Sequence, residues 1–175
     1  DRSRGLGDVY KRQHYDFLGA VENFFSKCAP AMFMGWSNLN FDRRMFHFNF
    51  FKGNRYPYAT HSSPNSEHDG LHIARAAQTL NSETLKTELT EAGNPSLALE
   101  SLSRMQGFDT SASHTAYVDA QNSLKVLRII KDKHKENWET FLKTSTKTSV
   151  ETFLKNEGIY SIFENVKGRN MMYLT

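Results

Sequence analysis

The chain has 175 residues, 38% of them hydrophobic, which is enough for one domain with a packed core. No apolar run approaches the roughly 20 residues that cross a bilayer, and no early segment is typical of a signal peptide. The single cysteine, Cys28, excludes an internal disulfide and favours a reducing compartment, so we expect a cytoplasmic protein. The net charge is +3, but residues 1–13 carry four basic and two acidic side chains, so the remainder is nearly neutral.

The first 13 residues, DRSRGLGDVYKRQ, show no helical or strand periodicity. They resemble the translated sequencing-adapter sequence that precedes some transcript-derived proteins. We therefore expect a non-native leader and leave it out of the fold prediction. A native disordered tail is the alternative interpretation, and it changes nothing that is predicted for the residues that follow.

Periodicity predicts mostly helices after this leader. Apolar residues at helical spacing predict a helix over 14–27, and the apolar run 29–34 is long enough for one buried strand. An aromatic-rich helix follows from Asp42, and residues 56–68 are predicted to be loop because of their prolines, asparagine and serines. Asp69 then opens a second helix.

The second half of the chain is predicted to add further helical segments and a hairpin. The helical segments are 84–91, a helix capped by Ser96 and ended by Gly107, 115–131, a short helix around Trp138, and 150–154, with a linker over 144–149. Two strands, 160–163 and 171–174, enclose residues 167–170 and predict the hairpin. Between residues 14 and 145 only one strand is predicted, too few to cover these helices in an α/β layer. The domain is therefore either all-α or lacks part of a sheet.

Asp42 is the first candidate for chemistry, because it lies where a strand ends and a helix begins. Sheets in α/β proteins present their ligands at this position. A carboxylate there can cap the helix through its first backbone N–H groups, or it can hold a metal. Spacing alone favours the cap, because Asp is among the preferred N-cap residues.

His114 and Asp119 form a second candidate pair. On one continuous helix, five residues place two side chains about 140° apart. If His114 precedes the helix, its side chain can fold back over the first turn and face the same cleft as Asp119. From spacing alone, two surface residues without a function are the simpler interpretation.

Taken together, these motifs resemble a known family. In chain order they are Asn38-x-x-Phe41-Asp42, Asp69 at a helix start, Leu97-x-Leu99-Glu100-x-Leu102, and His114-x-x-x-x-Asp119. Their order and spacing are similar to those of the DnaQ-like exonucleases of the DEDDh type, and among these to the bacterial exodeoxyribonuclease I family. The similarity extends from about Phe17 to the end of the chain.

The resemblance implies a partial RNase H-like α/β fold that is mostly helical because its first strands are missing. Residues 1–13 are then the leader, 14–145 the C-terminal part of the exonuclease catalytic domain, and 146–175 a linker and the beginning of an SH3-like domain. The final hairpin is what resembles the start of that SH3-like domain.

The resemblance also implies a reaction and its residues. The family removes nucleotides from the 3′ end of single-stranded DNA with two divalent ions, usually Mg²⁺, with Mn²⁺ as a substitute. Asp42 and Asp119 correspond to metal-ligating aspartates, His114 to the general base, and Asn38 to the asparagine that shapes the nucleotide site. Single-stranded DNA and, by family resemblance, single-stranded DNA-binding protein are the expected partners.

Basic and aromatic residues after Asp42 suit a single strand. Arg43 and Arg44 are candidates for phosphate contact, because the guanidinium group matches phosphate geometry. Aromatic side chains are candidates for base stacking: Phe46, Phe48, Phe51, Tyr56 and Tyr58. Since Phe is usually buried, most of these aromatic residues are expected in the core instead. The histidines in this part of the chain fit no structural zinc spacing: His47, His61, His68 and His72.

The sequence departs from the family at its first motif. An Asp-x-Glu on an apolar strand is absent, and the upstream acids Asp16 and Glu22 lie on a predicted helix. We therefore expect a fragment that lacks the first motif and the first strands. Such a chain should be unstable alone and have little or no nuclease activity, because two carboxylates hold a pair of divalent ions poorly.

Two alternatives stay open. A related exonuclease that acts on RNA or proofreads a polymerase is disfavoured by the segment after Tyr160, which resembles exodeoxyribonuclease I. A non-catalytic helical domain that binds nucleic acid or docks a partner is the other alternative. It would bind single-stranded DNA in a salt-dependent way, without regard to metal and unchanged in Asp119→Ala.

Overall fold

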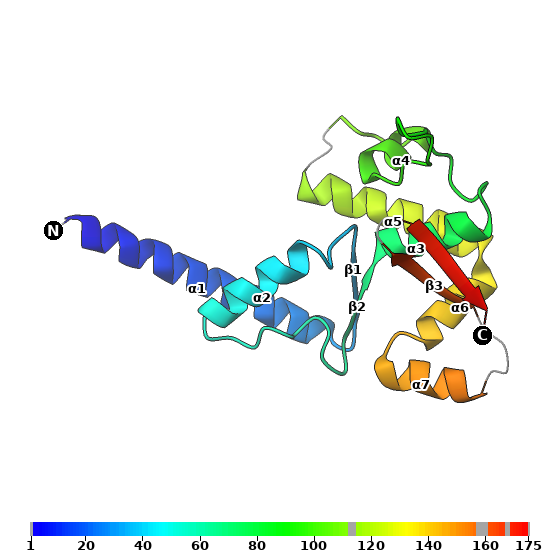
Figure 1. Ribbon diagram of the computed structural model, residues 1–175. Helices are drawn as coiled ribbons and strands as arrows, with labels where there is room; N and C mark the ends of the chain where they lie inside the picture. Colours follow the sequence, from blue (N-terminus) through cyan, green and yellow to red (C-terminus); the bar gives the residue numbers. More distant parts are fainter. Residues whose placement is uncertain (1, 112–114, 157–160, 167–168, 175) are drawn as a thin grey trace. The chain divides into compact units, whose positions relative to one another are not determined.

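The computed structural model of the chain describes residues 2–111, 115–156, 161–166 and 169–174. Helices dominate, as predicted (Figure 1). The elements are α1 Arg2–Cys28, β1 Met32–Gly35, α2 Asp42–Lys52, β2 Ser66–Asp69, α3 Gly70–Leu80, α4 Leu99–Met105, α5 Ala116–Lys133, α6 Lys135–Lys143, α7 Lys147–Asn156, β3 Ser161–Val166 and β4 Arg169–Leu174. The chain forms two compact units: unit 1 comprises Asp1–Met34 and Asn38–His68, and unit 2 comprises Gly35–Ser37 and Asp69–Thr175.

Unit 1 is built on α1 and α2. Leu18, Phe25 and Phe50 are its buried apolar side chains, and the ring of Phe25 lies 5.0 Å from that of Phe33 and 5.6 Å from that of Phe46. The helix predicted over 14–27 is confirmed. The helix also includes most of residues 1–13, which were left out of the fold prediction, because α1 begins at Arg2. Extending an existing helix needs no new nucleus, so the helix continues into residues of weak periodicity.

The strand predicted over 29–34 is confirmed as β1, and it pairs with β2 in a two-stranded sheet. The prediction of loop over 56–68 is wrong at its end, where β2 begins at Ser66. The sequence of β2, SEHD, does not alternate apolar and polar residues, so it does not predict a strand. The strand forms because this segment pairs with a distant one. The Ser66 amide donates to the Ala31 carbonyl at 3.0 Å, and the Ala31 amide donates to Oδ1 of Asn65 at 2.9 Å.

Unit 2 is organised around α5, which contacts α3, α4 and α6. The predicted helix over 115–131 is confirmed, and so is Asp69 as the residue that opens α3. Ser96 does not cap the next helix, because α4 begins at Leu99. The predicted helix over 84–91 is absent: Thr84 and Leu85 are buried in a bend of the chain. The Leu85 amide donates to Oε1 of Gln78 at 3.1 Å, so a tertiary hydrogen bond prevails over local helix propensity.

The C-terminal elements follow the prediction closely. β3 and β4 form an antiparallel hairpin in which Ser161 pairs with Leu174 and Val166 with Arg169. The linker predicted over 144–149 is shorter than expected, because α7 begins at Lys147. The assignment of this hairpin to an SH3-like domain stays a prediction.

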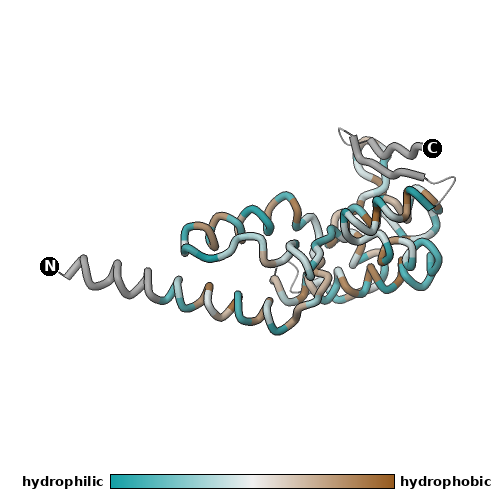
Figure 2. Tube along the Cα trace, turned by 90° about the horizontal axis from the view of Figure 1, so that it is seen from below, coloured by the Kyte–Doolittle hydropathy of each residue, from teal (hydrophilic) through white to brown (hydrophobic). Residues whose placement is uncertain are grey.

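Hydrophilic and hydrophobic residues are interspersed along the helices (Figure 2). Consequently, none of the helices in the described ranges is both long enough and apolar enough to traverse a bilayer.

Candidate functional site

The residues predicted to carry chemistry are distributed over both units. Asp42 belongs to unit 1 and Asp119 to unit 2, whereas His114 lies outside the described residues. Their convergence on one site, which the sequence predicts, stays a prediction. The surroundings of Asp42 and of Asp119 are therefore described separately, each within its own unit.

Asp42 is the first residue of α2 and is exposed. The capping interpretation is wrong, because the N-cap residue is Phe41 and no side chain caps this helix end. The Asp42 carboxylate makes no ion pair with another described residue, while the helix N-terminus stabilises its negative charge. It lines a cavity of about 240 Å³ in unit 1, together with His14, Phe17, Leu18, Val21, Met45, Phe46 and Asn49. This carboxylate is therefore accessible to a cation.

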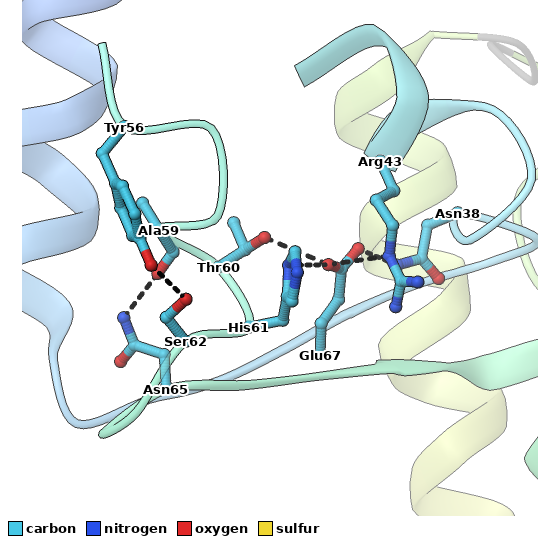
Figure 3. Close-up of polar contacts among 9 residues, drawn as sticks. All are labelled: Asn38, Arg43, Tyr56, Ala59, Thr60, His61, Ser62, Asn65 and Glu67. Carbon is cyan, nitrogen blue, oxygen red and sulfur yellow. Dashed lines mark hydrogen bonds and ion pairs between the residues drawn. The ribbon is translucent and has the colours of Figure 1, made fainter. Parts of the chain in front are cut away.

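A buried carboxylate next to this helix organises the predicted substrate-binding residues. Nδ2 of Asn38 donates to Oε1 of Glu67 at 3.1 Å, and Nε of Arg43 donates to Oε2 at 3.2 Å. Oγ1 of Thr60 donates to the same Oε2 at 3.0 Å, and Nδ1 of His61 lies 3.6 Å from it (Figure 3). Four side chains thus converge on one acidic group.

This arrangement limits what Asn38 and Arg43 can offer to a ligand. Arg43 uses Nε in the pair, so its two Nη groups are not part of it. Asn38 is buried, and its Oδ1 has no hydrogen-bond partner among the described residues. Glu67 was not predicted from the sequence. Its only signal was an acidic residue within a polar run, and the pairing partners lie 24 and 29 residues away in the chain.

His47 belongs to the same surroundings. Burial lowers the pKa of His47, nearby His61 and Arg43 lower it further, and Glu67 acts in the opposite direction. The rings of His47 and His61 have centroids 5.1 Å apart. Within the described part of the chain, no group of three or more His, Cys, Asp or Glu side chains is placed to hold a metal ion.

The aromatic residues after Asp42 are mostly at the surface, which corrects the expectation that most of them fill the core. All five candidates are exposed, and they are Phe46, Phe48, Phe51, Tyr56 and Tyr58. Arg44 is exposed on the same helix. Only Phe50, which was not among the candidates, is buried at the centre of unit 1.

Asp119 lies in the first turn of α5 and is half-buried. The connection before this helix is held by Asn122, whose Nδ2 donates to the Asp109 carbonyl at 3.1 Å. The Ser111 amide donates to the Asp109 carboxylate at 2.8 Å, and this bond lowers the pKa of Asp109. The segment around Asp109 is therefore tied to α5 through Asn122.

The fold defines the class of this chain: it has the fold of part of an RNase H-like domain of the kind found in Exonuclease I. It superposes on the crystal structure of E. coli Exonuclease I in complex with a dT13 oligonucleotide with a TM-score of 0.72 and 21% identity, over 79% of this chain and 30% of that chain. It superposes on an Exonuclease I from Methylocaldum szegediense with a TM-score of 0.74 and 18% identity, over 89% of this chain and 33% of that one.

The curated proteins that are similar to this chain in sequence are exodeoxyribonucleases I. Exodeoxyribonuclease I of E. coli is 30% identical over 120 residues, covering 66% of this chain and 24% of the relative. The exodeoxyribonuclease I of Buchnera aphidicola is 26% identical over 169 residues, covering 91% of this chain and 34% of the relative. The exodeoxyribonuclease I of Haemophilus influenzae is 26% identical over 119 residues, covering 67% of this chain and 25% of the relative. No family model matches the sequence. The chain is exodeoxyribonuclease I-like.

The chain spans a quarter to a third of the length of these curated relatives. Further solved structures of the same fold are an ExoI/SSB-Ct complex and a zinc-ion-bound form of an E. coli ExoI–ssDNA complex, each with a TM-score of 0.70 and 20% identity.

Proposed function

We propose that this chain forms part of a 3′–5′ exonuclease that degrades single-stranded DNA to nucleotides. The observation that carries the proposal is the similarity to exodeoxyribonuclease I over 91% of the chain, which includes the segments around Asp42 and Asp119. The fold relatives include enzymes crystallised with single-stranded oligonucleotides. A cytoplasmic location agrees with this substrate.

Asp42 and Asp119 are the proposed metal ligands. Carboxylate oxygens suit Mg²⁺ or Mn²⁺, and the exposed Asp42 carboxylate is free of ion pairs within the described residues, so the donor chemistry fits a hard cation. Bound divalent ions in such sites stabilise the charge that develops on the scissile phosphate. The two aspartates alone supply few ligands, which supports the proposal that the isolated chain has little or no activity.

The remaining roles are assigned to side chains of both units. His114 takes a proton from the attacking water as general base, a role that suits a group titrating near neutrality. Arg43 and Arg44 contact phosphate, and Asn38, held by Glu67, shapes the nucleotide site. A single-stranded DNA-binding protein is the proposed protein partner, since a fold relative has been solved with an SSB-Ct segment.

A chimera tests the function. Residues 14–145 replace the matching segment of E. coli exodeoxyribonuclease I, and release of nucleotides from 3′-labelled single-stranded DNA is measured with Mg²⁺. The chimera should be active, and His114→Ala should slow it by about 100-fold or more. Asp42→Asn and Asp119→Asn should abolish the metal-dependent rate, whereas Asp109→Asn should retain it. An active chimera that tolerates Asp119→Asn would refute the assignment.

The isolated chain provides the complementary measurement. It should release no nucleotide under the same conditions, and a rate comparable to that of an intact enzyme would overturn the proposed inactivity. Binding of single-stranded DNA that ignores metal and persists in Asp119→Ala, together with an inactive chimera, would favour the non-catalytic binding domain.

A further inference from the structure

Two imidazoles meet in unit 1, and each has a buried ring nitrogen without a hydrogen bond. His47 belongs to α2 and His61 to the loop between α2 and β2, and their ring centroids are 5.1 Å apart. Nε2 of His47 and Nδ1 of His61 are buried and have no hydrogen-bond partner among the described residues. The Tyr58 ring packs edge-on against both imidazoles, at 5.3 Å from His47 and 5.5 Å from His61. Two titratable rings therefore form a contact between α2 and this loop.

The charges around this pair are balanced while both imidazoles are neutral. The groups that face the pair are Arg43 from α2, Tyr58 from the loop and Glu67 from β2. Oε2 of Glu67 accepts a hydrogen bond from Nε of Arg43 at 3.2 Å and lies 3.6 Å from Nδ1 of His61 (Figure 3). The carboxylate therefore already neutralises the guanidinium group. A proton on either imidazole adds a positive charge next to this balanced pair.

The closed contact disfavours a proton on His47. Burial lowers the pKa of His47, His61 and Arg43 lower it further by their charge, and Glu67 acts in the opposite direction. When the rings of His61 and Tyr58 leave, water reaches His47 and its pKa returns towards the ordinary value of 6.5. The open arrangement then binds the proton more tightly, so the proton favours opening. The contact is complete above pH 6.5 and weakens as the pH falls below this value.

We propose that His47 and His61 form a latch that acid opens: a proton on His47 drives the rings of His61 and Tyr58 away from α2. The backbone of the loop is held separately by two side chains that do not titrate. Oγ1 of Thr60 donates to Oε2 of Glu67 at 3.0 Å, and Nδ2 of Asn65 donates to the Ala59 carbonyl at 2.8 Å. The latch therefore releases the rings while the loop stays anchored. It needs neither metal nor nucleic acid, so it is independent of the proposed function.

The test uses NMR on the full 175-residue chain without metal or nucleic acid. The ring signals of His47 are titrated between about pH 8 and about pH 5, the range in which an imidazole takes up its proton. Their midpoint should lie below 6.5. Nuclear Overhauser contacts from the His47 ring to the rings of His61 and Tyr58 should be present at the alkaline end. They should be lost at the acid end, with the same midpoint as the titration.

Two variants should shift this midpoint in opposite directions. His61→Gln removes a neighbour that can carry positive charge, so the midpoint of His47 should rise towards 6.5. Glu67→Gln removes the negative charge that favours the proton, so the midpoint should fall. A purely structural role of these two side chains would not produce shifts of opposite sign. His72→Gln is the matched control, because His72 is an exposed histidine of α3 in unit 2, and it should leave the midpoint unchanged.

Three results would overturn the latch. The first is a His47 midpoint at or above 6.5 in the unsubstituted chain. The second is a lowered midpoint with ring contacts that persist at the acid end, because the proton would then bind without releasing the rings. The third is an acid-induced movement of the Tyr58 ring that persists in His47→Gln, because another group would then operate the contact. The first two measurements decide the proposal even where His47→Gln does not fold.

Discussion

At the scale of single residues, Glu67 is the acceptor that several polar side chains of unit 1 share. Its side chain is 6% exposed and accepts hydrogen bonds from Asn38, Arg43 and Thr60. Glu67→Ala deprives these donors of their shared acceptor, and breaking a buried charge pair from one side costs several kcal/mol. We expect the free energy of unfolding to fall by about 3 kcal/mol, measured by urea denaturation followed by circular dichroism.

Two further variants separate burial from charge. Glu67→Gln keeps one acceptor oxygen and presents a donor in place of the other, so its loss of stability should be intermediate. Glu88→Ala also removes a carboxylate paired with an arginine, Arg104, but this pair lies at the surface and should leave the midpoint almost unchanged. Equal losses in Glu67→Ala and Glu88→Ala would contradict the importance assigned to burial.

What sequence can predict at this scale depends on how local the interaction is. The start of α2 at Asp42 follows from neighbouring residues, and it was predicted correctly. The pairing of Glu67 with Asn38 and Arg43 needs β2 beside β1, and β2 has no apolar pattern of its own. The exposed rings of Phe48 and Phe51 were misjudged for a related reason, because average burial of a residue type cannot say which side of a helix faces a partner.

At the scale of elements, Asp69 fixes both the start of α3 and the turn that precedes α2. Its Oδ1 accepts from the Leu71 amide at 2.9 Å and from the Ser37 amide at 2.8 Å, and the carboxylate is buried. Ser37 has a φ of 58°, a backbone conformation that a non-glycine residue seldom adopts unless its surroundings hold it there. Asp69→Ala removes a helix cap and leaves a second amide without its acceptor, so we expect a loss of about 2–3 kcal/mol.

The measurement for Asp69 is urea denaturation followed by tryptophan fluorescence, since Trp36 precedes Ser37. Asp69→Asn retains the acceptor oxygen and should lose much less stability than Asp69→Ala. Asp109→Ala removes a comparable bond to the Ser111 amide at an exposed turn, and it should change stability little. If Asp69→Asn destabilises as much as Asp69→Ala, the charge rather than the acceptor position holds this junction.

At the scale of the whole chain, the two units have unequal cores. Among the side chains whose burial the structure describes, unit 1 buries Leu18, Phe25 and Phe50, whereas the buried apolar residues of unit 2 are Ala74, Ala77, Leu85, Leu102, Val126, Leu127 and Ile130. Apolar burial is the main favourable term in folding, so unit 1 should unfold first. Both tryptophans, Trp36 and Trp138, belong to unit 2, while α1 and α2 contribute helical signal from unit 1.

Part of the helical circular dichroism should therefore disappear at a lower urea concentration than the change in tryptophan fluorescence. Phe25→Ala should destabilise the first transition by about 3–5 kcal/mol and leave the second in place, and Leu102→Ala should do the reverse by about 2–5 kcal/mol. Coincident transitions in the unsubstituted chain would contradict separate unfolding.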